Sequence, residues 1–423
     1  MTIIYFILVL GITVFIHELG HFMFAKKFGV HVYEFSIGMG PKLFKFNRKN
    51  DETNYCIRLL PIGGFVQMAG EEVEVDEKIP ENKRLQSKTA FERFMIMVAG
   101  VMMNFILAIV ILFIIGLCNT ISTDNRHIAD SRIEGLNNGD TIVAIDGHFV
   151  NNYDKLNLEL ACVGDKDFTL TVKTKDGKKK FEISPIAVGE SNLIYGLNYG
   201  FTVSSNKDEK YIIKDSKIEG LENDSIILNI NGNEVTDYNS LLHLVSDAGN
   251  TFELGYEYDG EVNSITVEAH ELKNDKLIGY NYGFYLKGHE ERGLLAAIKY
   301  AFIKFFSTLE QMIFTIVYLI TGRLSLKLLS GPVGIYSIVG VYSKAGFMNI
   351  LSLLALICIN VGFINLLPLP AFDGGHVVFI IIEKIKGSKV DPKVENTIHT
   401  IGFVLLLILM VLVTYNDIVK LFH

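Results

Sequence analysis

An HExxH pattern lies within an apolar stretch that is long enough to cross a bilayer. His17, Glu18 and His21 fall inside residues 3–25, which carry no other charged side chain. A run of about 20 apolar residues spans the hydrocarbon layer as a helix. On a helix, residues four apart face the same side, so both imidazoles can bind one metal ion with Glu18 beside it. The pattern therefore predicts a hydrolytic Zn²⁺ site within the membrane.

Burial of three ionisable groups in lipid is costly and usually marks function. The alternative is a purely structural role, in which these side chains only hydrogen-bond a neighbouring helix. Composition agrees with a membrane protein, because 49% of the residues are hydrophobic and the mean hydropathy is +0.32. The 39 basic and 47 acidic residues include no long basic block, so we expect no nucleic-acid partner. The four cysteines are scattered and imply no disulfide framework.

The apolar segments predict a polytopic α-helical membrane protein with four transmembrane helices. We place these at residues 1–28, 91–119, 346–370 and 396–418. The region 291–345 is also apolar, but Lys299, Lys304 and Glu310 interrupt it. We interpret it as an amphipathic helix and loop on the membrane surface. If it crossed the membrane, the segment after residue 370 would lie on the opposite side from His21.

Basic residues mark one side of the membrane as cytosolic, because positive loops stay inside. They follow the first span and precede the second and the fourth: Lys26, Lys27, Lys42, Lys45, Arg48, Lys49, Lys83, Arg84, Lys88, Arg93, Lys384, Lys386, Lys389 and Lys393. Both termini and residues 120–290 are then extracytoplasmic. The metal site is expected near the cytosolic leaflet.

The exterior region contains an internal repeat. The segment DSRIEGL at 130–136 recurs as DSKIEGL at 215–221. Each copy continues into an alternating strand, a turn and a helical pattern. These features look like two extracytoplasmic α/β PDZ-like domains, at 120–200 and 201–290, which bind chain ends by strand addition. Two spacers without a peptide groove are the alternative. The second copy has Asn223-Asp224 where the first has Asn138-Gly139, so its binding loop is expected to be degenerate.

Turn-punctuated, alternating runs between the first two spans predict β-hairpins in the region 29–90. Bare strand edges cannot face lipid, so such hairpins are packed by helices or line a wet cavity. A half-buried edge at Gly64 and Phe65 would hold a substrate in extended form. An ordinary cytosolic hairpin is the equally weighted alternative.

A third metal ligand is expected on the cytosolic side, in the segment 371–395. Asp373 follows Pro368 and Pro370, which break the helix and force an irregular turn. Two imidazoles and one carboxylate leave a fourth position open, as in catalytic zinc sites. His376 is a competing ligand. Asp373 is alternatively, or in addition, the N-cap of a helix that begins at Gly374.

Taken together, these motifs resemble the site-2 protease family over essentially the whole chain. The resemblance is carried by the HExxH element, the GFVQM segment ending at Met68, Gly100 with Asn104, and the NxxPxPxxDGG block at 365–375. It implies that His17, His21 and Asp373 bind zinc, that Glu18 is the catalytic carboxylate and that Asn365 contacts substrate. One departure is Val101, where the family usually has proline. We further expect the substrate to be contacted by Asn104, Pro368, Pro370, Gly64 and Phe65.

The resemblance implies an intramembrane zinc endopeptidase of the bacterial cytoplasmic membrane. Its partners would be the bilayer and single-span proteins, such as anti-sigma factors or remnant signal peptides, after their outer parts have been trimmed. A catalytically inactive zinc-binding PDZ scaffold is the main alternative, although Glu18 would serve no purpose there. A metal transporter would instead spread its ligands through the bilayer.

Overall fold

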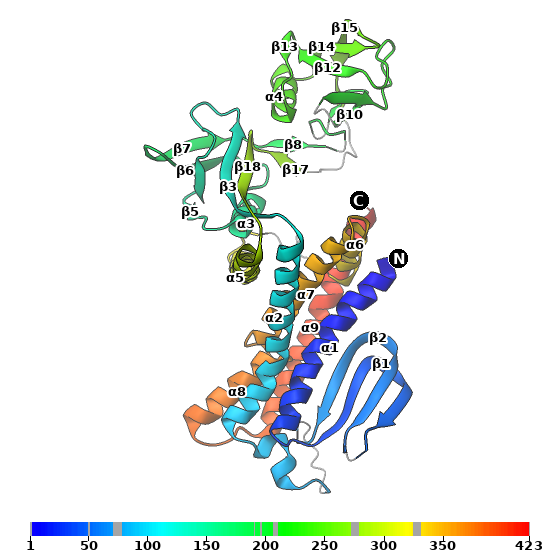
Figure 1. Cartoon of the computed structure of the whole chain (residues 1–423), viewed down its shortest axis with the longest axis vertical. Coiled ribbons are helices and arrows are strands. Elements are labelled where there is room, and N and C mark those ends of the chain that lie inside the picture. Colours follow the sequence, from blue (N-terminus) through cyan, green and yellow to red (C-terminus); the bar gives the residue numbers. More distant parts are fainter. Residues whose placement is uncertain are drawn as a thin grey trace. The chain divides into compact units, whose positions relative to one another are not determined.

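The chain forms two compact units. The computed structural model describes residues 2–49, 51–70, 78–189, 191–194, 197–205, 210–271, 279–324 and 331–422. One unit comprises Met1–Ile121 and Glu291–His423, and the other comprises Ser122–Glu290. Figure 1 shows the long helices of the first unit and the small sheets of the second.

The first unit is mainly helical. Its helices are α1 (Thr2–Lys27), α2 (Ala90–Cys118), α5 (Leu294–Ile320), α6 (Pro332–Lys344), α7 (Phe347–Leu366), α8 (Asp373–Lys386) and α9 (Pro392–Phe422), with short 3₁₀ turns at Glu81–Lys83 and Leu85–Ser87. Within the described part of the chain, α1, α2, α5, α7 and Lys393–Tyr415 of α9 are long and apolar enough to cross a membrane. The chain is a multi-pass membrane protein.

Helix α5 meets the length and apolarity of a span, although Lys299, Lys304 and Glu310 give it the charge pattern of a surface helix. The face of α5 that carries Ala297 packs closely on α2, because a Cβ added to Gly116 of α2 would collide with Ala297. Further along, the rings of Phe305 and Phe105 meet edge to face at 5.2 Å. In Figure 1, α5 is drawn nearly end-on, whereas α1 and α2 run along the long axis. The structure thus orients α5 differently from these two spans.

Small residues bring α1, α2 and α7 close together. A Cβ on Gly20 of α1 would collide with the backbone of Ala99 in α2. Likewise, Gly362 of α7 faces the ring of Phe105. Because lipid gives no hydrophobic drive between helices, such close packing supplies much of the attraction in a membrane. The close approach of α1 and α2 places the HExxH turn directly against α2.

Strands β1 (Val32–Asn47) and β2 (Asn54–Met68) occupy the loop where hairpins were predicted. Both are bent. Residues 34–37 pair with 54–57 on one side and with 64–67 on the other, while 42–47 pair with 54–58. The pieces therefore form a small mixed sheet in which residues 64–68 are an edge. Figure 1 shows this sheet beside α1.

The second unit contains both copies of the repeat. Its first copy has β3 (Ile121–Ser131), β4 (Thr141–Ile145), β5 (His148–Phe149), α3 (Tyr153–Val163), β6 (Phe168–Thr174), β7 (Gly177–Ile183) and β8 (Ile186–Val188). The chain continues with β9 (Leu197–Asn198), β10 (Thr202–Ser205), β11 (Tyr211–Lys214), β12 (Ile226–Ile230), β13 (Asn233–Glu234), α4 (Tyr238–Ala248), β14 (Thr251–Tyr258), β15 (Glu261–Glu268), β16 (His270–Glu271), β17 (Gly279–Asn281) and β18 (Phe284–Glu291). Helices α3 and α4, like strands β4 and β12, occupy equivalent positions in the two copies, as the repeat predicts.

The two main sheets have matching orders, β18-β3-β4-β6-β7 and β10-β11-β12-β14-β15. The domain boundaries expected from the sequence grouped β18 with the second copy, yet it lies beside β3 in the first sheet. The first sheet is therefore completed by a strand that follows the second copy in the chain. The second copy is inserted between β8 and β17, which pair with each other.

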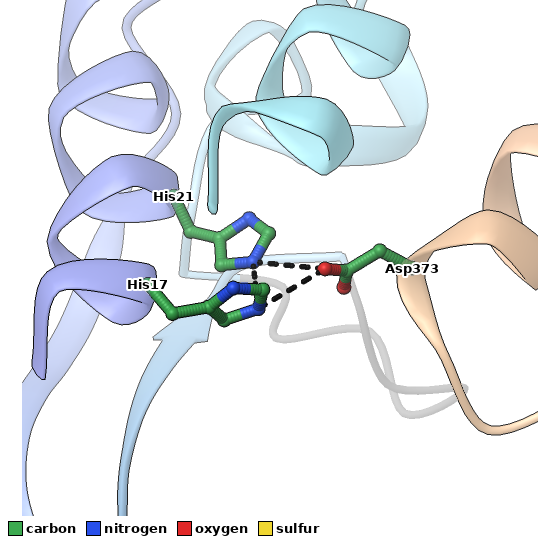
Figure 2. A group of neighbouring side chains, drawn as sticks. All are labelled: His17, His21 and Asp373. Atoms are coloured by element: carbon green, nitrogen blue, oxygen red, sulfur yellow. Dashed lines mark hydrogen bonds and ion pairs between the residues drawn. The ribbon is translucent and has the colours of Figure 1, made fainter. Parts of the chain in front are cut away.

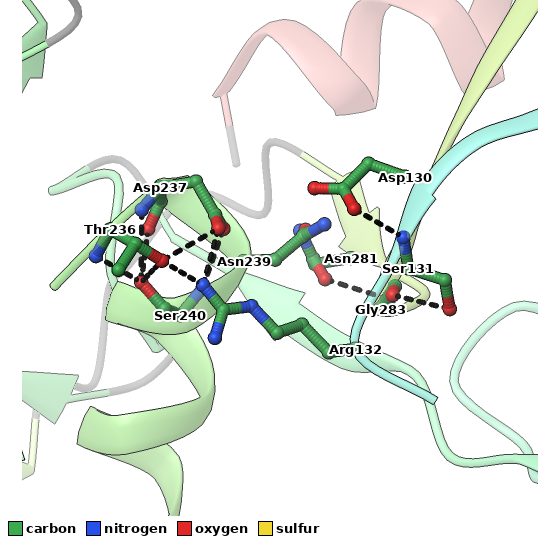
Figure 3. A network of polar contacts seen from close by, with 9 residues as sticks. All are labelled: Asp130, Ser131, Arg132, Thr236, Asp237, Asn239, Ser240, Asn281 and Gly283. Atoms are coloured by element: carbon green, nitrogen blue, oxygen red, sulfur yellow. Dashed lines mark hydrogen bonds and ion pairs between the residues drawn. The ribbon is translucent and has the colours of Figure 1, made fainter. Parts of the chain in front are cut away.

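Polar contacts join the two copies near the start of α4 (Figure 3). The guanidinium of Arg132 donates to Thr236 and Asp237, and Asn281 Nδ2 donates to Asn239 Oδ1 at 2.6 Å. Burial opposes ionisation of Asp237, but hydrogen bonds from the Ser240 amide and Arg132 lower its pKa overall. These contacts tie the inserted copy to the chain segments that enter and leave it.

Candidate zinc centre

Two imidazoles and one carboxylate converge where α1 meets the start of α8. The Nε2 atoms of His17 and His21 lie 3.1 Å apart. Oδ2 of Asp373 lies 3.1 Å from Nε2 of His17 and 3.4 Å from Nε2 of His21. Figure 2 shows both rings pointing from α1 toward this carboxylate. Residues from the beginning of the sequence and from near its end thus form one cluster.

The cluster has the spacing and donor types of a catalytic zinc site. With bonds of about 2.0–2.1 Å, neighbouring ligands of a tetrahedral zinc ion lie about 3.3–3.4 Å apart. The three atoms, which offer a candidate metal site, are separated by 3.1 to 3.4 Å. Both histidines are buried. One tetrahedral position remains for water or substrate, so the arrangement fits catalysis better than a closed structural site.

A backbone carbonyl of α2 orients one of the histidines. The Ile96 carbonyl oxygen lies 2.8 Å from Nδ1 of His21. Because a carbonyl can only accept, Nδ1 carries the proton and Nε2 keeps its lone pair for a metal. Such a partner fixes the tautomer of a metal-binding imidazole and its direction. No residue type in α2 signals this contact, because it is made by the main chain.

Gly100 of α2 forms the wall behind the two imidazoles. A Cβ at this position would lie 2.8 Å from Cε1 of His17 and 2.9 Å from Nδ1 of His17, and closer still to Nε2 of His21. No other residue fits there without displacing the rings. In the sequence, Gly100 stood out only as part of a resemblance; the structure gives it a steric role.

Glu18 faces the edge strand of the small sheet. The amide of Val66 donates a hydrogen bond to its carboxylate. Gly64 lies next to the same side chain, since a Cβ there would be 3.6 Å from Cγ of Glu18. The edge of residues 64–68 is therefore positioned against the HExxH turn rather than in open solvent. Phe65 stacks under the guanidinium of Arg58 at 4.9 Å.

The irregular turn between α7 and α8 aims Asp373 at the histidines. Pro368 and Pro370 lack N–H groups, and Ala371 adopts a left-handed φ of 78°. A side chain on Gly374 would collide with the carbonyls of Leu366 and Leu367, so α8 can fold back over α7 only with glycine there. Phe372 is the N-cap of α8, and Asp373 is its first residue. The expected N-cap role of Asp373 is therefore wrong, and its carboxylate is directed at His17 and His21.

The competing ligand, His376, does not join this cluster. Its Nδ1 lies 3.0 Å from Oε1 of Glu395, and its ring stacks on His399 at 3.9 Å with 15° between the planes. These three residues are close enough for a metal ion. However, nitrogen lone pairs lie in the ring planes, so those of two parallel stacked rings do not converge on one ion. We interpret this second cluster as structural support.

In the described part of the chain, no hydrogen bond or ion pair joins the other expected substrate contacts to the three ligand side chains. Asn104 is fully buried on α2, and neither polar atom of its side chain has a hydrogen-bond partner in the described residues. Asn365 is half-buried near the end of α7, Pro368 is exposed, and Pro370 packs against Gly402 of α9. An unpartnered buried amide one turn beyond Gly100 is available to a ligand.

Comparison with known proteins decides the family. Residues 5–409 match peptidase family M50. The chain belongs to this family. The resemblance to site-2 proteases is thereby confirmed over nearly the whole chain. The M50 chain is also 32% identical to the zinc metalloprotease RasP of Shouchella clausii, over 100% of this chain and 99% of the relative.

Two further relatives have names that include a regulatory role. The M50 chain is 31% identical to the regulator of sigma-W protease RasP of Bacillus subtilis, covering 100% of this chain and 99% of that protein. It is also 31% identical to the regulator of sigma-E protease RseP of Escherichia coli, covering 97% of each. The predicted enzyme class, a zinc-dependent metalloendopeptidase, is confirmed.

Proposed function

We propose that this M50 peptidase hydrolyses peptide bonds within the membrane, with His17, His21 and Asp373 as zinc ligands and Glu18 as the proton carrier. The observation that carries the proposal is the mutual spacing of three ligand atoms, 3.1 to 3.4 Å, from helices far apart in sequence. A scaffold with a structural metal would not require the adjacent Glu18.

The residues divide the chemistry between them. Zinc, when bound, supplies a Lewis acid that polarises the scissile carbonyl and acidifies water. The Glu18 carboxylate takes a proton from the attacking water and delivers it to the leaving amine. The Val66 amide holds this carboxylate in position. No covalent bond between enzyme and substrate is needed.

The proposed topology has four spans, α1, α2, α7 and α9, with α5 on the outer membrane surface. Its support is the end-on orientation of α5 relative to α1 and α2 and its three interrupting charges. With four spans, the end of α7 lies on the same side as His21, as the cluster requires. Loop charges then place the centre near the cytosolic leaflet, with both termini and the repeats outside.

The edge of residues 64–68 is proposed to pair with the unwound substrate. A transmembrane helix hides its carbonyls in its own hydrogen bonds, so it must be extended before hydrolysis. An edge strand offers unpaired main-chain groups to such a segment. Contact of Gly64 and Val66 with Glu18 places this edge beside the catalytic carboxylate. This supports substrate binding over an ordinary cytosolic hairpin.

Disulfide cross-linking tests the edge pairing. We introduce Phe65→Cys into a Glu18→Gln chain that lacks the four native cysteines, and pair it with single cysteines scanned along a single-span substrate. Because side chains alternate across a strand, cross-links are expected at every second substrate position. Phe44→Cys, on an exposed part of the sheet, is the control. A period of three to four, or equal cross-linking from both positions, contradicts the proposal.

The exterior repeats are proposed to act as PDZ-like filters that favour trimmed substrates. A cavity of about 640 Å³ in this unit is lined by Asp130, Val203, Tyr211, Asp237, Tyr238 and Tyr285 among others. Two carboxylates in its lining disfavour capture of a C-terminal carboxylate. We therefore propose exclusion of bulky outer domains rather than capture of chain ends. By analogy with the sigma-regulating relatives, the substrates are membrane-anchored anti-sigma factors, with remnant signal peptides as a second group.

Chelation provides the decisive test of the function. Purified full-length protein in detergent is incubated with a single-span model substrate, with and without a zinc chelator. Cleavage should stop when zinc is removed and return when zinc is added back, because the ligands are left without a Lewis acid. Binding of the substrate without cleavage in both conditions would instead support the scaffold.

A further inference from the structure

The turn that presents Asp373 has little support of its own. Pro368 and Pro370 donate no hydrogen bonds, and Ala371 has a φ of 78°, which L-residues with a Cβ rarely adopt. The contacts within the turn are a bond of 2.7 Å from the Leu369 amide to the Leu367 carbonyl and a long bond of 3.4 Å from the Phe372 amide to Leu369. Its conformation must be stabilised from outside.

That external support comes from His399 in α9. The amide of Ala371 donates to Nδ1 of His399 at 3.0 Å. Since Nδ1 accepts, a neutral ring carries its proton on Nε2. Close packing surrounds this bond: a Cβ on Gly402 would collide with Pro370, and a Cβ on Gly375 would lie 3.0 Å from Cε1 of His399. The turn and α9 are therefore in direct contact.

The His399 ring is itself held in place. It stacks on His376 at 3.9 Å, and His376 is paired with Glu395 one turn earlier in α9 at 3.0 Å. The ring of Phe379 also packs against that of His399, with 5.5 Å between the ring centroids. Side chains of α8 and α9 thus fix the direction in which Nδ1 points. A rotation of His399 would leave the Ala371 amide without its acceptor.

The position of this bond relates it to the metal. Asp373 lies shortly after Ala371 in the chain, so a rotation of the peptide at Ala371 moves the carboxylate away from His17 and His21. Metal sites tolerate ligand displacements of only about 0.5 Å. The apolar middle of α9 is exposed, since none of its most apolar 18 residues is buried. Near the other end of α9, Asp417 is buried and accepts from the amides of Gly331 and Gly334. The contact at His399 is the one that reaches the turn before Asp373.

We propose that His399 is a positioning residue for the zinc ligand Asp373, acting through the main-chain amide of Ala371. The inference rests on the proposed ligand role of Asp373. It makes α9, which provides no zinc ligand, a determinant of zinc affinity.

Two substitutions separate hydrogen bonding from packing. His399→Asn keeps an acceptor at the δ1 position, whereas His399→Leu fills similar space without one. Zinc affinity is measured on the purified full-length proteins by competition with a chromogenic chelator, together with kcat and KM. We expect the leucine variant to lose about 10–100-fold in zinc affinity, as for other partners of metal ligands, and the asparagine variant to stay close to wild type. Leu405→Ala, exposed on α9, is the control.

The outcomes are distinguishable. Wild-type zinc affinity in both His399 variants, or an equal loss in both, overturns the positioning role, because the acceptor would then make no difference. A separate variant, Asp373→Ala, tests the underlying assignment. If Asp373→Ala keeps wild-type zinc affinity, the proposed zinc site itself fails; if only His399→Leu is silent, the site stands and the inference fails.

Discussion

Glu18→Gln is expected to abolish cleavage while zinc stays bound. The substitution keeps size and shape but removes the group that accepts a proton from water. General acid-base catalysis contributes about 10²–10⁴-fold, so kcat should fall by at least that range. Zinc content should remain at one ion per chain, because the proposed ligand atoms belong to His17, His21 and Asp373. Metal analysis and cleavage of a single-span substrate, measured on the same preparation, check both halves of the expectation.

The control for Glu18→Gln is the same chemical change at an exposed site of the second unit, Glu268→Gln. This variant should cleave at the wild-type rate. Full activity in Glu18→Gln would remove Glu18 from the mechanism. Loss of zinc together with activity would instead show that this carboxylate is needed to assemble the site, which also contradicts the assigned role.

A single methyl group on Gly100 should eliminate zinc binding. In Gly100→Ala the new Cβ would overlap the ring of His21 and lie 2.8 Å from Cε1 of His17. Interiors are packed too densely to absorb this overlap, so either the rings rotate or α1 moves away from α2. Either movement displaces the Nε2 atoms of His17 and His21, which must stay within a few tenths of an ångström of their positions to bind zinc. Zinc content and activity should both fall to background.

Gly340→Ala is the matched control for Gly100→Ala. Gly340 is also within a helix, α6, but its Cβ would meet Thr2 at 3.5 Å, an ordinary contact. Alanine favours helix over glycine by about 1 kcal/mol, so this variant should be at least as stable as wild type. Normal zinc content in Gly100→Ala would show that the two histidines are not held against α2 as the structure indicates.

How much the sequence predicted depended on how local each feature is. His17 and His21 are one helical turn apart, so their shared face follows from helix geometry alone. Asp373 was predicted by a longer argument, from loop charges and the sidedness of the spans. The structure brings the three side chains together, and their role as zinc ligands stays a prediction. The repeat was also detectable, because the segments at 130–136 and 215–221 are nearly identical.

The remaining features are made by backbone atoms or by remote packing. The Ile96 carbonyl and the amides of Val66 and Ala371 have no signature in residue type, so no pattern pointed to them. His399 lies in α9. Its hydrogen bond with the Ala371 amide depends only on how α9 packs against the turn between α7 and α8. The alternative N-cap role of Asp373 was wrong, because Phe372, which follows the left-handed Ala371, is the N-cap and Asp373 is the first residue of α8.

The placement of β18 affects how the second unit is made. During synthesis β3 emerges long before its partner β18, so one of its edges stays open while the whole second copy is translated. Unpaired edges of this kind attract wrong partners. We therefore expect the inserted copy to reach its native form first and the enclosing copy to close last, with newly synthesised chains most prone to misassembly in the interval.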